Sequence, residues 1–168
     1  MSQGREASAN KVNANEILAP LGQPVSNQDI VQLLQAGWLM GARPKPKRGE
    51  TDINIHLEGS GLELGFSLAE SLPSRWGGAR SEGMLIFDVV FFSPTGAPSA
   101  ALCRDLPRGL QFSTSRSQAR ASLGTPEWSS PVAVIHNDRW RMGDRMITVD
   151  FDDDEAAIEQ VVVQLATA

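Results

Sequence analysis

The sequence predicts an α+β fold made of two tandem units, each with short helices packed on an antiparallel sheet. Strand-like apolar runs recur in both halves of the chain, and each half opens with a helical pattern. The tetrapeptides Leu21–Pro24 and Leu123–Pro126 share the pattern Leu-Gly-x-Pro, which can end a helix. A Pro, Ala and Gly-rich stretch separates the halves. We therefore expect a frayed N-terminus at residues 1–12, a first unit at 13–93, a connector at 94–105 and a second unit at 106–168.

Composition and charge narrow the class of protein. The chain has 168 residues, of which 41% are apolar and 21% charged, as in globular domains. Its net charge of −5 argues against a nucleic-acid partner and is compatible with a basic protein partner. Cys103 is the only cysteine, so no intramolecular disulfide can form, which fits a reducing compartment. The N-terminal stretch has no apolar signal region, and no run approaches the ~20 apolar residues of a membrane span. We expect a cytoplasmic protein that does not bind membranes.

The first unit should contain two helices followed by strands. Asn13 or Asn15 can cap a short helix, and a second should follow Ser26 or Asn27. The second helix is indicated by apolar residues spaced i, i+3, i+4 and i+8, namely Ile30, Leu33, Leu34 and Trp38. Residues 52–58 alternate and turn at Gly59-Ser60, which predicts a hairpin. Three further segments are a basic, proline-spaced loop at 43–49 (a solvated linker or a nucleic-acid patch), an exposed loop at 71–83 and a central strand at 84–93.

The second unit should begin with a helix from Ser115 to Leu123. Ser113 or Ser115 can cap it, Gly124 can take the left-handed conformation after it, and Pro126 blocks its continuation. Four strands are predicted to follow, at Val132–His136, Asp138–Met142, Arg145–Phe151 and Ile158–Leu165. Trp140 is expected in the core.

Five carboxylates crowd between the last two of these strands, at Asp150, Asp152, Asp153, Asp154 and Glu155. A calcium loop counted from Asp150 would need Gly where Glu155 stands and a bidentate Glu where Val161 stands. Three interpretations stay open: a solvated acidic turn, an acidic patch that faces a partner, and a calcium site. We predict no metal site and no cofactor.

Catalytic motifs are missing from the sequence. There is no Gly-x-Ser-x-Gly, no phosphate-binding glycine loop and no zinc-ligand spacing around His56 or His136. Cys103 and His136 could form a nucleophile and base, but no helix start follows Cys103 to lower its pKa, and a packed, inert thiol is the favoured interpretation. We therefore predict a protein that is not an enzyme.

Two tryptophans fall in predicted loops, Trp76 and Trp128. Exposed aromatic residues often anchor protein interfaces, although both side chains could instead fold back over sheet edges. The predicted partner-binding residues are Asp150, Asp152, Asp153, Asp154, Glu155, Trp128 and Trp76.

The order of short motifs in the chain resembles a known class of bacterial proteins. The motifs are Leu106–Phe112, Ser115-Arg116, Leu123–Pro126 and Asp138-Arg139-Trp140, followed by an apolar strand, the acidic turn and a valine-rich strand. This order is similar to that of cytoplasmic proteins from polymorphic-toxin and type VI secretion immunity loci. The helix stop and strands also resemble the tandem units of beta-lactamase inhibitory protein and of small outer-membrane assembly lipoproteins.

The resemblance implies a non-enzymatic binding protein, an immunity protein that neutralises a co-encoded toxin or effector by occluding it. A structural or adaptor protein of a secretion system is the first alternative, and a small hydrolase is the second. A neighbouring toxin gene would favour the first function, and neighbouring secretion-apparatus genes would favour the adaptor.

Overall fold

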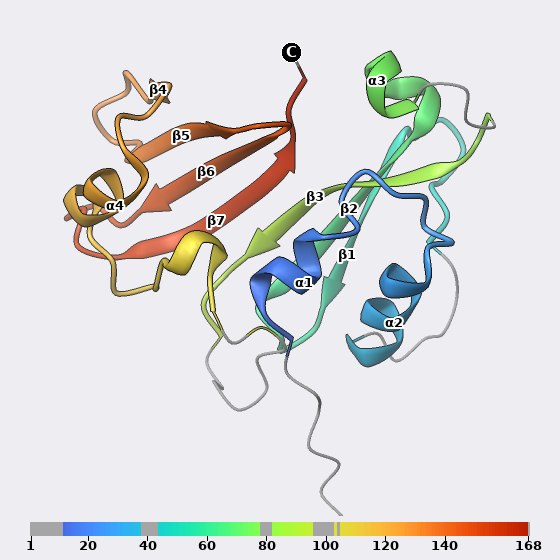
Figure 1. Ribbon diagram of the computed structural model, residues 1–168, viewed down its shortest axis with the longest axis horizontal. Coiled ribbons are helices and arrows are strands. Elements are labelled where there is room, and N and C mark those ends of the chain that lie inside the picture. Colours follow the sequence, from blue (N-terminus) through green and yellow to red (C-terminus); the bar gives the residue numbers. More distant parts are fainter. Residues whose placement is uncertain (1–11, 38–43, 78–81, 96–102, 104, 168) are drawn as a thin grey trace, which may run out of the picture.

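The computed structural model describes residues 12–37, 44–77, 82–95, 103 and 105–167. They form an antiparallel sheet of seven strands in the order β1-β2-β3-β7-β6-β5-β4 (Figure 1). The strands are β1 Asp52–Leu57, β2 Leu62–Leu68, β3 Leu85–Phe92, β4 Trp128–Ser129, β5 Asn137–Met142, β6 Arg145–Phe151 and β7 Ile158–Leu165. The α+β class is confirmed. The expected frayed N-terminus lies almost wholly outside the described residues, as do Trp38 and most of the connector.

In the described residues, four α-helices accompany the sheet: α1 Ala14–Leu18, α2 Gln28–Gly37, α3 Ser74–Gly77 and α4 Arg116–Leu123. Single 3₁₀ turns, η1 Ala69–Ser71 and η3 Pro107–Gly109, lie after β2 and before α4. Two predicted caps are confirmed. Asn13 and Ser115 each accept a hydrogen bond from the third helical residue, whose side chain bonds back to the cap.

One face of the sheet packs with the helices into a single core. That core joins Ile17 of α1, Ile30 of α2 and Ala119 of α4 to alternate residues of the strands, such as Val90 and Val149. The last strands of the two halves, β3 and β7, pair at the middle of the sheet. The sheet is thus continuous, and the predicted central strand at 84–93 has a neighbour on each side.

The opposite face of the sheet, called here the open face, carries side chains that are mostly partly exposed. Strand register places one row across all seven strands: His56, Glu63, Phe91, Val162, Thr148, Arg139 and Trp128. The row ends on Trp128, whose ring lies 5.1 Å from the Arg139 guanidinium carbon.

Several sequence predictions are wrong in detail. The predicted loop at 71–83 contains the end of η1 and the helix α3. Residues Val132–His136 form no strand but an exposed loop. Gly22 does not end a helix: α1 stops at Leu18, and the Gly22 N–H donates to the Phe87 carbonyl at 2.7 Å. Gly124 has the expected positive φ of 88°, but its ψ of −169° lies outside the left-handed helical region.

Candidate protein-binding surface

The loop of residues 130–136 between β4 and β5, called here the apolar loop, exposes large apolar side chains. Val134 is 78% exposed, and Val132 and Ile135 are each nearly half exposed. With Trp128, 42% exposed, they are the exposed large hydrophobic residues of the described chain. Hydrogen bonds from Ser130 N–H to the Asn137 carbonyl and from Ile135 N–H to the Val132 carbonyl fix the loop backbone. The loop therefore presents these side chains in a defined conformation.

A groove of about 450 Å³ lies beside the apolar loop. Val134 and Ile135 form part of its wall, and three carboxylates, Asp150, Asp153 and Glu159, also line it. Its remaining lining residues are His136, Phe151 and Gln160. An apolar rim beside several negative charges suits a segment that is both apolar and basic.

The predicted acidic turn has two kinds of carboxylate. Asp152 accepts hydrogen bonds from the N–H groups of Ala156 and Ala157, at 2.7 and 3.2 Å, so it holds the turn itself. Asp153 and Asp154 are exposed, and neither forms a hydrogen bond or an ion pair with another described residue. Part of the charge in the turn therefore serves to hold the turn itself. The carboxylates that can contact a partner are Asp150, Asp153 and Asp154.

Glu155 belongs to the structural group as well. Its backbone has a φ of 56°, and its Oε1 bonds Arg116 Nη1 at 2.6 Å and His136 Nδ1 at 2.8 Å. The hydrogen bond from Arg116, with that from His136, lowers the pKa of Glu155. Through His136, this carboxylate ties the end of the apolar loop to α4.

Asp138 of β5 forms the centre of a second ionic cluster, which sequence reasoning missed. Its side chain is fully buried and accepts two hydrogen bonds each from Arg116 and Arg120 of α4, at 2.7 to 3.1 Å. Ser129 Oγ adds a fifth at 2.6 Å. Burial opposes ionisation of this carboxyl, but the hydrogen bonds from Arg120, Arg116 and Ser129 outweigh it and hold the pKa of Asp138 well below its usual range. The cluster fixes α4 to the strands that carry the apolar loop.

The two predicted tryptophan anchors have different environments. Trp128 lies in the short strand β4 rather than in a loop, and its side chain is exposed next to the apolar loop. Trp76 lies in α3, half buried, where its indole donates to the Ala166 carbonyl at 3.0 Å and its ring faces Gly22. This geometry favours the packing interpretation for Trp76 and the anchor interpretation for Trp128.

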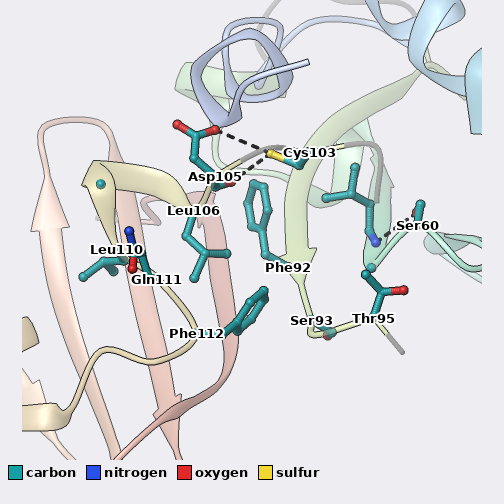
Figure 2. Close-up of a pocket in the computed structure, with 13 residues that line it drawn as sticks. Ser60, Phe92, Ser93, Thr95, Cys103, Asp105, Leu106, Leu110, Gln111 and Phe112 are labelled. Atoms are coloured by element: carbon teal, nitrogen blue, oxygen red, sulfur yellow. Dashed lines mark hydrogen bonds between the residues drawn. The ribbon is translucent and has the colours of Figure 1, made fainter. Parts of the chain in front are cut away.

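Cys103 and His136, considered above as a nucleophile and base, contact different groups. Cys103 Sγ lies 2.9 Å from the Asp105 carbonyl oxygen, whereas His136 pairs with Glu155. Cys103 lines a pocket of about 360 Å³, and Figure 2 shows Phe92, Leu106 and Phe112 in its wall. Within the described part of the chain, no group of three or more His, Cys, Asp or Glu is placed to hold a metal ion.

The sequence predicted a strand for Val132, Val134 and Ile135 because apolar residues alternate loosely there. Pro131 and the serines before it were the available signal for a loop. Glu159 was overlooked because β7 reads as apolar, although its exposed positions alternate with buried ones.

Comparisons with known proteins add little. No protein-family model matches the chain, and no curated protein matches it. A solved structure that resembles it is the DUF4309 family protein YjgB from Bacillus subtilis, with 13% identity and a TM-score of 0.40 over 80% of this chain and 76% of that one. A likeness this low carries no argument about family or function. Among the described helices, none is both long and apolar enough to cross a membrane.

Proposed function

We propose that this protein is a non-enzymatic binding protein that uses the apolar loop and the adjacent acidic groove to hold a basic protein partner. The observation that carries the proposal is the exposure of Val132, Val134, Ile135 and Trp128 on one hairpin. Exposing apolar surface in water is unfavourable, and solvent-exposed apolar clusters commonly mark protein interaction sites. A tryptophan beside aliphatic side chains is a frequent interface anchor.

The negative charge of the acidic groove favours a basic partner. Asp150, Asp153 and Glu159 in the groove, with Asp154 beside it, repel an acidic protein and attract a basic one. A toxin that acts on a polyanion such as nucleic acid needs a basic cleft. The proposed role is therefore that of a cytoplasmic immunity protein, which covers the cleft of a co-encoded bacterial toxin or effector.

The architecture proposed for this role is a pair of tandem units, β1–β3 with α1 and α2, and β5–β7 with α4. The central pairing of β3 with β7 supports it, because each is the last strand of its half. The different positions of Gly22 and Gly124 relative to their helices weigh against an accurate duplication.

Co-expression tests the proposed role. Cells expressing the reading frame next to the gene for this chain should stop growing, and this protein should restore growth. Its variant Val134→Asp, which places a charge on the most exposed apolar residue, should restore growth less well at equal abundance, while Glu58→Gln on the exposed β1–β2 turn should act like the parent. Growth unaffected by the neighbouring frame would count against the toxin, and full rescue by Val134→Asp would count against the apolar loop.

A further inference from the structure

A further cavity, distinct from the acidic groove and from the pocket at Cys103, lies on the open face of the first half of the sheet. It has a volume of about 450 Å³ and lies between strands β1 to β3, β7 and the η1–α3 segment. Its lining residues are Thr51, Asp52, Asn54, Phe66, Ser67, Ser71, Leu72, Pro73, Trp76, Asp88, Val89, Phe91, Gln164, Leu165 and Thr167. Two of these side chains are carboxylates, and none of the described lining residues is Lys, Arg or His.

The carboxylate of Asp88 is the unusual feature of this cavity, because one of its oxygens has no hydrogen-bond donor among the described residues. It lies at the irregularity in the β2–β3 pairing, opposite the step from Gly65 to Phe66. Its Oδ2 accepts a hydrogen bond from Ser67 Oγ at 2.9 Å, but its Oδ1 is buried and has no hydrogen-bond partner among the described residues. A buried acceptor left without a donor is costly, so such groups in native proteins generally have a function or an additional partner.

The other walls of the cavity suit a cation with apolar parts. Trp76 and Phe91 supply aromatic surface, and Asn54 offers a further amide group. The Arg75 guanidinium already lies over the Trp76 ring, 5.5 Å from its centre, so a cationic ligand would share this ring with Arg75. A planar guanidinium carries several donors and stacks on aromatic rings, so it can satisfy a carboxylate and an apolar wall together.

We propose that this cavity binds a ligand bearing a guanidinium group, which donates to the carboxylate of Asp88 and stacks on the aromatic wall. The site does not depend on the apolar loop or on the proposed partner. The guanidinium can belong to a free small molecule or to an arginine side chain of a peptide, because both present the same planar cation.

Titration of Asp88 supplies an independent check. Burial raises the pKa of Asp88, hydrogen bonds from Ser67 and from the backbone of Asp88 itself oppose this, and the nearby charge of Asp52 adds to the rise. Asp52 is the other titratable residue in the lining. The affinity for a guanidinium should therefore fall as pH drops through the raised pKa, since the protonated carboxyl no longer attracts the cation.

The experiment is an NMR titration that follows the indole N–H of Trp76 and the amides of β1 to β3. Propylguanidine and an acetylated Gly-Arg-Gly amide are the two probes, and propylurea is the uncharged control of the same shape. We expect saturable shifts with propylguanidine, and affinity at least about tenfold lower for propylurea and for Asp88→Asn. Glu58→Gln, a loss of charge on the exposed β1–β2 turn, should leave the affinity unchanged.

Binding of the peptide as well would extend the site to arginine side chains, and binding of propylguanidine alone would limit it to small molecules. Equal binding of propylurea, unchanged affinity in Asp88→Asn, or no saturable shift in the parent would overturn the proposal. Should Asp88→Asn fail to fold, the pH titration of the parent decides, because pH-independent affinity contradicts a role for the carboxylate.

Discussion

Asp138 is a buried carboxylate that holds two arginines of one helix. Arg116 and Arg120 are spaced i, i+4, so both reach the same strand residue from one face of α4. Ser129 completes the set of donors from β4. One side chain thus joins α4, β4 and β5, the elements on either side of the apolar loop.

Replacing Asp138 by Asn should destabilise the protein by about 3 kcal/mol, because two arginines then lose their anion while Arg116 stays nearly buried. The midpoint of urea unfolding measures the loss. Asp144→Asn, in the exposed β5–β6 turn, is the matched control and should change stability by less than about 0.5 kcal/mol. A near-parental midpoint for Asp138→Asn would show that the cluster adds no net stability.

Local sequence signals predicted several single residues well. The caps Asn13 and Ser115 follow from side-chain chemistry that acts within a few residues, and the positive φ of Gly124 follows from its lack of a Cβ. The burial of Trp140 was also predicted. Asp138 was not predicted, since its partners lie 18 and 22 residues away and only the fold brings them together.

At the scale of the element, the acidic turn combines structure and surface charge. Asp152 and Glu155 form bonds within the protein, whereas Asp153 and Asp154 face solvent. A substitution of all the aspartates together would mix these two roles. The single variants separate them.

Asp152→Ala should lower stability by about 1 kcal/mol, because two turn N–H groups lose their acceptor. Asp153→Ala should have almost no effect on folding, since its side chain is exposed. Thermal unfolding of the two variants beside the parent makes the comparison. Equal melting temperatures for the two variants would show that the Asp152 side chain does not stabilise the turn.

The ionic clusters also predict how the docking of α4 depends on pH. The folded-state pKa values of Asp138 and Glu155 are both depressed, so the unfolded chain takes up protons first as pH falls. Their contribution is complete above the ordinary carboxyl pKa of about 4 and is lost as pH falls through the depressed values. Unfolding midpoints between pH 7 and pH 2 should therefore decline below about pH 4. The decline should be shallower in Asp138→Asn, and identical profiles would contradict this assignment.

The predicted strands were correct where apolar residues alternate over a long run, and the prediction failed where the apolar run is short. Strands β6 and β7 have the predicted bounds, because each alternates over seven or eight residues. Residues 132–136 offer only five positions, and the sheet has no place for them once β4 and β5 pair directly. Their exposure became visible only in the structure.

At the scale of the whole molecule, α1, α2 and α4 pack on one face of a continuous sheet (Figure 1). The candidate surfaces lie at the apolar loop and on the open face. Open-face positions Asp150 and Gln160 line the acidic groove, while Asp88 and Gln164 line the cavity. The α+β class could be predicted from the sequence, whereas the joining of both halves into one sheet through β3 and β7 could not, because strand order depends on contacts between distant segments.

The central claim is that the apolar loop and its acidic neighbours hold a basic protein. The direct test is the kinetics of association with the protein of the adjacent reading frame, at two salt concentrations, for the parent, Asp153→Asn with Asp154→Asn, and Val134→Ser. We expect the double variant to associate more slowly with a weaker salt dependence, because charge steers the encounter. Val134→Ser should mainly speed dissociation, since apolar contacts act after the encounter. Rate constants that match the parent in both variants at low salt would contradict the account.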